Sequence, residues 1–142
     1  MNRIGASAAI ALAVGALTMC DEPQSSEALA RAYVEAINRG DLSSLDTLLV
    51  DDCEWHAGGA SPLIGKEQVV AGHEREIGLN TRLALTLVEA RRDTVRLHLM
   101  ETSDRLRDMG IDEASRPSYL IVRNGRIQRI ERLAPTAWGE SP

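Results

Sequence analysis

The chain has 142 residues, which is enough for one domain with an apolar core that needs neither a metal nor a disulfide. A formal net charge of −5 argues against nucleic-acid binding, because contact with phosphates requires a basic surface. Two Trp, two Tyr and no Phe leave the core to be filled by aliphatic side chains.

The first 19 residues are predicted to be a signal peptide. A short start with one positive charge is followed by an uncharged run over residues 4–19. This run is shorter than the roughly 20 residues that a membrane-spanning helix requires. A positive start before a short apolar run is typical of an export signal.

A cysteine follows the apolar run. Leu17-Thr18-Met19-Cys20 resembles the lipobox of bacterial lipoproteins, although Met19 stands where the lipobox has a small residue. The resemblance implies lipidation of Cys20, a tether over residues 20–25 and a location at the cell envelope, on its periplasmic or extracellular face. Cleavage after Ala16 followed by secretion is the alternative. Lipidation would leave Cys53 as a buried free thiol, whereas in a secreted chain the two cysteines could pair.

Three helices are predicted in the first half of the exported chain. Ser26 can cap the first helix, and Gly40 can close it in the left-handed conformation. Asp41 can cap a second, short helix whose leucines share one face. The third helix opens at Gly65 and places His73 on its apolar face, which points His73 at the core or at a cavity.

A sheet is predicted after these helices. One strand begins at Cys53, and Asn124-Gly125 is a strong signal for the turn of a later hairpin. The other predicted strands cover residues 82–90, 94–102, 117–123 and 126–133. The order of elements predicts an α+β domain over residues 26–133, with three N-terminal helices packed in a curved, mostly antiparallel sheet and an irregular tail over residues 134–142.

Several of these segments resemble one protein family. AYVEAINRGDLSSLDTLLVDDCEWH, the later Gly65-Lys66-Glu67 and the closing Asn-Gly-Arg-Ile turn are similar to the SnoaL-like branch of the nuclear-transport-factor-2-like superfamily. The resemblance implies a cone of curved sheet around a ligand pocket, and a homodimer formed through the outer face of the sheet. The superfamily includes isomerases, cyclases, epoxide hydrolases and non-catalytic modules, so the fold alone does not fix the activity.

The resemblance extends only in part to known catalytic residues. Tyr33 stands where ketosteroid isomerases have a hydrogen-bond donor, but Ala57 stands where they have the aspartate base. An isomerase without a base cannot transfer the proton at a useful rate. Asp104 matches one aspartate of limonene-epoxide-hydrolase-like enzymes, but the arginine that bridges their two aspartates falls on Thr102, and the second aspartate on Arg132.

Strand alternation and the family resemblance disagree about which face of the strand over residues 94–102 points toward the helices. Alternation places its Val and Leu side chains toward the main core. The resemblance instead places His98 and Asp104 on the cavity side. The sequence leaves both open.

The candidate catalytic residues are Asp104 and His73. Asp104 could equally serve as a helix cap, and His73 as a structural histidine in the core. The candidate ligand-binding residues share a predicted position near the cavity, with an ordinary place in the core or on the surface as the alternative. They are Tyr33, Trp55, His98, Tyr119 and Arg132. No metal ligands stand at a recognisable spacing, so neither a metal nor another cofactor is expected.

The sequence therefore predicts an exported, lipid-anchored SnoaL-like domain. It is expected to bind a small apolar molecule in an internal pocket, with acid/base catalysis of the isomerase or cyclase kind as an open possibility. The alternative is a non-catalytic dimerisation or partner-binding module at the cell envelope. The expected partners are this ligand and a second copy of the chain, with no nucleic acid and with membrane contact only through the lipid anchor.

Overall fold

The computed structural model describes residues 25–137. The predicted signal peptide, Cys20 and the last five residues lie outside them. The helices are α1 (Ser26–Arg39), α2 (Leu42–Leu48), α3 (Lys66–Gly78) and α4 (Asp104–Asp108). The strands are β1 (Leu49–Ala57), β2 (Leu63–Ile64), β3 (Arg82–Arg91), β4 (Thr94–Thr102), β5 (Ala114–Arg123), β6 (Arg126–Arg132) and β7 (Thr136–Ala137).

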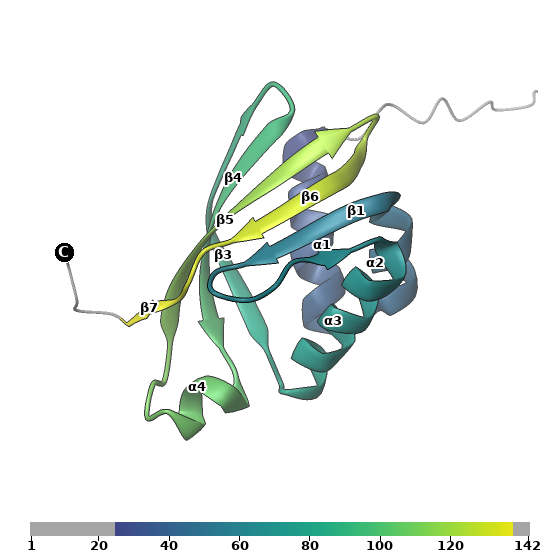
Figure 1. The fold of residues 1–142 in the computed structure, drawn as a ribbon. Helices are drawn as coiled ribbons and strands as arrows, with labels where there is room; N and C mark the ends of the chain where they lie inside the picture. Colours follow the sequence, from purple (N-terminus) through teal and green to yellow (C-terminus); the bar gives the residue numbers. More distant parts are fainter. Residues whose placement is uncertain (1–24, 138–142) are drawn as a thin grey trace, which may run out of the picture.

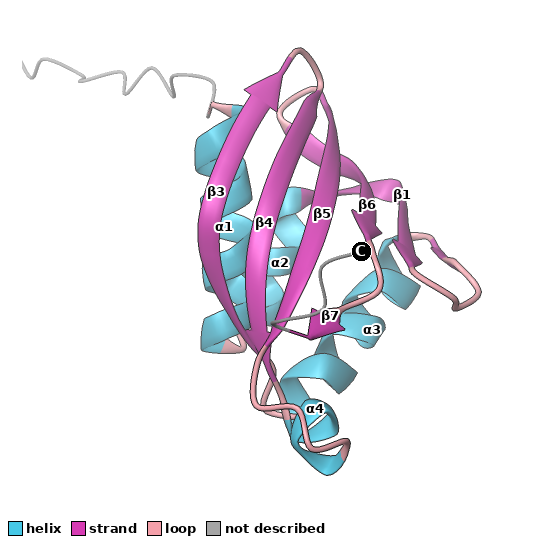
Figure 2. Ribbon diagram, turned by 90° about the vertical axis from the view of Figure 1, so that its left-hand side faces the viewer, coloured by secondary structure: helices cyan, strands magenta, loops and turns pink. Residues whose placement is uncertain are grey.

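The strands form one curved sheet in the order β2-β1-β6-β5-β4-β3, with β7 added beside β5. All pairs are antiparallel except β1 with β6, which run parallel. Helices α1, α2 and α3 cover one face of the sheet, and α4 lies at the end where β4 and β5 are joined (Figures 1 and 2). The predicted α+β architecture, with helices packed in a curved and mostly antiparallel sheet, is confirmed.

The ends of the helices follow the local signals. Gly40 ends α1 with a φ of 66°, and the side chain of Asp41 accepts a hydrogen bond from the backbone N–H of Ser44 at the start of α2, as predicted. The cap of α1 is Ser25 rather than Ser26, because it is Ser25 whose hydroxyl oxygen accepts from the N–H of Ala28. Asp104 is not the cap of α4, since the residue before it, Ser103, has that role.

The side chains of β4 face the sides that strand alternation predicts, and not those that the resemblance implies. Val95, Leu97 and Leu99 are fully buried and belong to the core under the helices. His98 therefore points to the other face of the sheet, which we call the outer face. There its ring contacts the hydroxyl groups of Thr86 and Ser115 on the neighbouring strands.

The remaining differences from the sequence prediction are short strands and extensions. β1 begins at Leu49 rather than at Cys53, β2 was not predicted, β5 begins three residues before the predicted start, and the tail expected to be irregular forms β7. The Asn124-Gly125 turn is confirmed, with a positive φ at both residues and Arg123 paired with Arg126. Cys53 is a free, fully buried cysteine.

Candidate functional site

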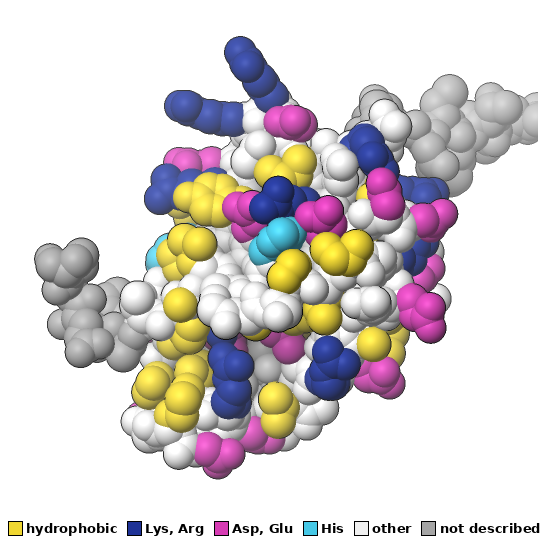
Figure 3. Space-filling view, viewed as in Figure 1, with side chains coloured by type: hydrophobic (Ala, Val, Ile, Leu, Met, Phe, Trp, Pro, Cys, Tyr) yellow, Lys and Arg dark blue, Asp and Glu magenta, His cyan; other side chains and the backbone are white. Residues whose placement is uncertain are grey.

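A cleft of about 360 Å³ opens at the end of the domain where α3, α4 and β5 converge. One side is apolar, formed by Trp55 and Ala57 of β1, Leu63 of β2 and Gly72 of α3. The remaining lining residues come from the loop after β1, from α3 and the turn that follows it, from α4 and from β5. They are Ala60, Ser61, Arg75, Glu76, Leu79, Arg105 and Arg116. In the space-filling view, basic and apolar side chains lie together over this part of the face (Figure 3).

A closed ring of hydrogen bonds lies behind the cleft. Arg132 donates from one guanidinium nitrogen to the hydroxyl oxygen of Tyr33 (2.8 Å) and from the other to Oε1 of Glu76 (2.6 Å). His73 completes the ring, with Nε2 3.3 Å from the Tyr33 oxygen and Nδ1 3.1 Å from Oε2 of Glu76. Because a carboxylate only accepts, Nδ1 of His73 carries the proton, and Nε2 accepts the hydroxyl hydrogen of Tyr33.

The protonation states of the four groups agree with this arrangement. Burial would raise the pKa of Glu76, but the charge of Arg132 and the hydrogen bond from His73 lower it to about 2. Burial lowers the pKa of His73, so that its ring is neutral near pH 7. Burial raises the pKa of Tyr33 to about 12, and its phenol stays protonated. The ring therefore contains one carboxylate and one guanidinium as its only charges.

Trp55 joins the ring of hydrogen bonds to the cleft. Its indole stacks on the imidazole of His73 with 4.3 Å between ring centroids, and the guanidinium carbon of Arg132 lies 5.1 Å from the indole centroid. Gly72 makes this packing possible. A Cβ at residue 72 would lie 2.7 Å from the indole and 2.6 Å from the side chain of Leu63. Of the four residues of the hydrogen-bonded ring, only Glu76 lines the cleft, and Trp55 lines it beside Glu76.

A second buried ion pair borders the cleft from the sheet side. The guanidinium of Arg116 on β5 pairs with the carboxylate of Glu101 on β4, and both residues are less than 5 % exposed. Ser103 donates to the other oxygen of Glu101. The inner face of the sheet thus turns from apolar to ionic toward this end, where Arg116 and Arg132 point inward.

Four of the residues singled out in the sequence are brought together here: Tyr33, Trp55, His73 and Arg132. Only Trp55 among them lines the cleft. His73 is completely buried with both ring nitrogens engaged, so its contacts are those of an orienting group behind Glu76. Arg132 is also buried, and its ion-pair partner is Glu76.

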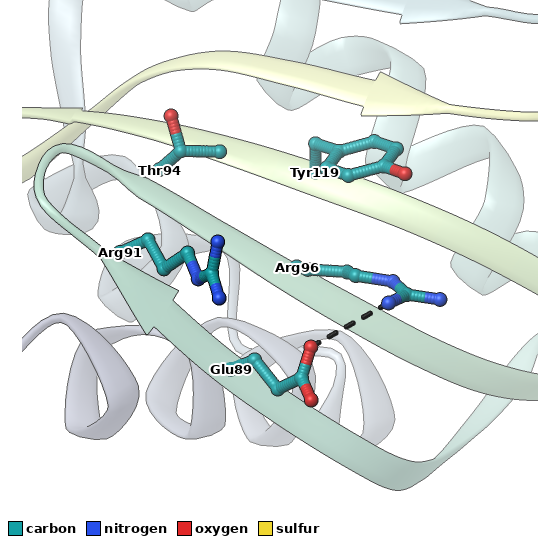
Figure 4. A pocket seen from close by; sticks show the side chains of 5 residues that line it. All are labelled: Glu89, Arg91, Thr94, Arg96 and Tyr119. Carbon is teal, nitrogen blue, oxygen red and sulfur yellow. Dashed lines mark ion pairs between the residues drawn. The ribbon is translucent and has the colours of Figure 1, made fainter.

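The other three candidates lie elsewhere. Asp104 is partly exposed at the first turn of α4, where it accepts from Asn80 at 2.6 Å and pairs with Arg107. His98 and Tyr119 lie on the outer face, away from the cleft. Figure 4 shows Tyr119 in an outer-face pocket of about 470 Å³ beside Arg96, which pairs with Glu89.

Most residues that line the cleft were missed in the sequence, and two of them, Glu76 and Arg116, carry a signal that could have identified them. Glu76 follows His73 by three positions, so the two share a face of α3, a spacing that could have identified the pair. Arg116 alternates with Ser118 and Leu120 along β5, which places it on the inner face. Its strand was predicted to begin only at residue 117, and this hid the alternation.

Two further properties concern residues 25–137 as a whole. No group of three or more His, Cys, Asp or Glu side chains in this range could hold a metal ion. None of its helices is long and apolar enough to cross a membrane.

The fold and sequence have known relatives. Residues 30–130 match the family model of the SnoaL-like domain. A candidate ketosteroid isomerase from Kribbella flavida has a TM-score of 0.69 at 20 % identity, covering 82 % of each chain. An epoxide hydrolase of the LEH-like kind from M. tuberculosis has a TM-score of 0.64 at 17 % identity, covering 75 % of this chain and 80 % of that one.

A third similar structure is a candidate polyketide cyclase from Sinorhizobium meliloti, with a TM-score of 0.65 at 14 % identity, covering 73 % of this chain and 92 % of that one. No curated protein matches the sequence significantly. At these identities the structures support a common fold and not a common activity. The family model matches well over half of the sequence, and the chain therefore belongs to the SnoaL-like domain family.

Proposed function

We propose that the domain binds a small, largely apolar molecule in the cleft beside Trp55 and Glu76. The observation that carries the proposal is the cleft itself, whose volume of about 360 Å³ falls within the usual range for small-molecule sites. It combines an apolar side with a few convergent polar groups, which is the usual composition of such sites. The isomerase, cyclase and hydrolase among the similar structures support a ligand-binding role for the fold.

The charge state of Glu76 favours recognition over proton transfer. An efficient general base has a pKa near the working pH, and a carboxylate with a pKa of about 2 is a very weak base. Glu76 is nevertheless held rigidly by Arg132 and His73, so it can accept a hydrogen bond from a ligand hydroxyl or amide. Ala57 lies at the cleft where isomerases of this superfamily have their base, which further weakens the case for isomerase chemistry.

Acid/base catalysis is the second candidate, and the orientation of Glu76 is what favours it. A general base needs a fixed direction, and two partners fix this carboxylate from behind. A direct test is to incubate the protein with a β,γ-unsaturated ketosteroid and follow the ultraviolet absorbance of the conjugated product. Binding without isomerisation is the expected result. Isomerisation by the wild type that is lost in Glu76→Gln, measured where circular dichroism shows this variant to be folded, would establish catalysis instead.

Ligand-stabilised melting tests the binding proposal. Wild-type protein is screened against a set of small apolar metabolites, beside Ala57→Phe, which fills the cleft, and Ala84→Phe, which adds the same ring at an exposed position on β3. Compounds that raise the melting temperature of the wild type are expected to act on Ala84→Phe and to have no effect on Ala57→Phe. A set in which no compound stabilises the wild type would contradict the proposal.

The location at the cell envelope is part of the same proposal. Lipidation of Cys20 would attach the domain to the membrane through residues 20–25. Mass spectrometry of the protein purified from a bacterial host tests it, with Cys20→Ser as the control. A mass gain equal to diacylglycerol on a chain that begins at Cys20 supports the anchor, and a chain that begins at Leu17 without lipid supports secretion.

A further inference from the structure

The cleft is a positively charged site on an acidic protein. Three arginines from three different elements line it: Arg75 from α3, Arg105 from α4 and Arg116 from β5. Glu76 is the only acidic residue among the lining residues of the described chain. The whole chain carries a formal charge of −5, so this concentration of positive charge runs against the overall balance.

Two of the charges at the cleft are already neutralised. Arg132 pairs with Glu76 from behind, and Glu101 pairs with Arg116 from the side of the sheet. Arg132, Arg116 and Glu101 are buried, whereas Glu76 is partly exposed at the cleft, and each of the four charged groups contacts its counter-ion. These four residues therefore contribute no net charge to the cleft.

The remaining charged residues that line the cleft are Arg75 and Arg105. Within residues 25–137, no acidic side chain lies at ion-pair distance from either of them. Arg107, two residues further along α4, differs in that it pairs with Asp104 and does not line the cleft. An anion bound between Arg75 and Arg105 would supply the counter-ion that both lack among the described residues.

Resting on the binding function proposed above, we propose that the ligand is a small apolar molecule with a carboxylate group. The apolar body lies against Trp55 and Leu63, and the carboxylate faces Arg105 and Arg75. The planar guanidinium group matches a carboxylate with two parallel N–H donors, which makes arginine a common partner for this anion. Ligands in which this group is neutral or cationic are disfavoured by the same charges.

Matched probes test the charge preference independently of ligand shape. The full chain is titrated by calorimetry with 1-naphthoate, 1-naphthamide and 1-naphthylmethylamine, and then with octanoate, octanamide and octylamine. Within each set the apolar body is constant, and the headgroup changes from anionic to neutral to cationic. The acid is expected to bind about tenfold more tightly than the amide, because each partly screened cation contributes modestly. Added salt should weaken binding of the acid and leave the amide unchanged.

Variants assign the preference to the two arginines. In the double variant Arg75→Gln/Arg105→Gln, affinity for the acids is expected to fall about tenfold to the level of the amides. The matched control is Arg107→Gln, which removes a positive charge from the same short helix without touching the cleft, and it should keep the acid preference. Both replaced arginines are exposed, so the fold is expected to survive their substitution.

The possible failures are distinct. If the amides or amines bind the wild type as tightly as the acids, the carboxylate inference is wrong while the binding function stands. An acid preference that persists in the double variant also overturns the inference, because the charge is then read elsewhere. If none of the six probes binds and the metabolite screen is also negative, both the inference and the proposed function fall.

Discussion

Arg132 has the largest side chain among the fully buried residues of the described chain, and its charge depends on a single carboxylate. The Glu76 oxygen 2.6 Å away balances this charge, and the hydroxyl of Tyr33 takes up a second donor. Removing one partner of a buried pair leaves the other charge without compensation, which commonly costs about 3–5 kcal/mol. Glu76 therefore has two roles: it balances the buried charge of Arg132, and it lines the cleft.

Stability is expected to fall in acid because of Glu76. Its folded-state pKa of about 2 lies below the ordinary value of 4.5, so its contribution is complete above pH 4.5 and is lost as the pH falls toward 2. The shift corresponds to roughly 3 kcal/mol. Urea unfolding at a series of pH values between 7 and 2 measures it. Glu76→Gln should be less stable at pH 7 and should lose much of this pH dependence.

His73 is expected to cause a separate loss of stability at a higher pH than Glu76 does. Its folded-state pKa is lowered by burial, so its stabilising effect is present above its ordinary pKa of 6.5 and diminishes as the pH falls below that value. His73→Gln can replace its hydrogen bonds in part but cannot be protonated. The variant is expected to flatten the stability curve just below pH 6.5, while the wild-type decline nearer pH 4 persists. An unchanged curve would mean that His73 titrates normally in the folded protein.

Cys53 should be chemically silent in the folded domain. The thiol is completely buried, and burial is the main cause that raises its pKa to about 11, so the reactive thiolate is scarce at pH 8. In Cys20→Ser protein, an Ellman-type thiol assay is expected to detect no rapid reaction under native conditions and one thiol per chain in denaturant. Rapid labelling of the native protein would contradict the buried environment.

At the scale of elements, the contact of α3 with β1 sets the shape of the cleft. Gly72 lets the helix approach the indole of Trp55 and the side chain of Leu63, and both of these line the cleft. Gly72 lies within a helix, where alanine would normally be favoured by up to about 1 kcal/mol. The close approach reverses that expectation.

Gly72→Ala is expected to destabilise the domain. The added Cβ would meet the rigid indole ring at a distance that real structures do not show, and overpacking of this kind costs roughly 1–3 kcal/mol. The matched control is Gly78→Ala at the end of the same helix, where an added Cβ meets no atom within 4 Å. Thermal unfolding of both variants measures the difference. Equal stability would show that Trp55 moves aside without cost, and ligand affinity should then change instead.

Local patterns predicted most of the elements because they depend on neighbouring residues. The strands predicted over residues 82–90 and 94–102 match β3 and β4 within one residue, and Gly40 and Asp41 mark the joint of the first two helices as expected. The pairing of β1 with β6 was not predictable in this way. It joins segments about half the chain apart, and no local spacing encodes it.

The same distinction explains the candidate site. Tyr33 and His73 were found because each has a local signal, a helix face or a family motif. Their joint partner Arg132 could not be assigned, since the ion pair with Glu76 bridges 56 residues. Asp104 was proposed as catalytic from a family motif alone. In the structure its carboxylate contacts Asn80 and Arg107 on the surface.

At the scale of the whole molecule, the two faces of the sheet have different compositions. The inner face is apolar under the helices and becomes ionic at the cleft. The outer face carries mixed side chains from β3, β4 and β5, among them Leu87, which is 40 % exposed, and the half-buried Tyr119. His98 lies between Thr86 and Ser115, and both of its ring nitrogens contact hydroxyl groups of these residues.

The homodimer expected from the sequence would use this outer face. Partial exposure of Leu87 and Tyr119, together with the outer-face pocket beside Arg96, gives a second copy both apolar area and charge to contact. Light scattering after size-exclusion chromatography is expected to give twice the chain mass for the wild type. The double variant Leu87→Lys/Tyr119→Glu should give the single mass, because charged side chains at the centre of such a contact cannot be desolvated cheaply.

A matched control separates this effect from a general gain in solubility. Met109→Lys introduces a charge at a more exposed apolar residue on the turn after α4, away from the outer face, and should leave the dimer intact. Ligand binding provides a second readout, since the cleft opens on the opposite side of the sheet from Tyr119. A monomeric double variant that still binds the naphthoate probe would place association and recognition on separate surfaces. A wild-type chain that remains monomeric at high micromolar concentration would rule out the dimer.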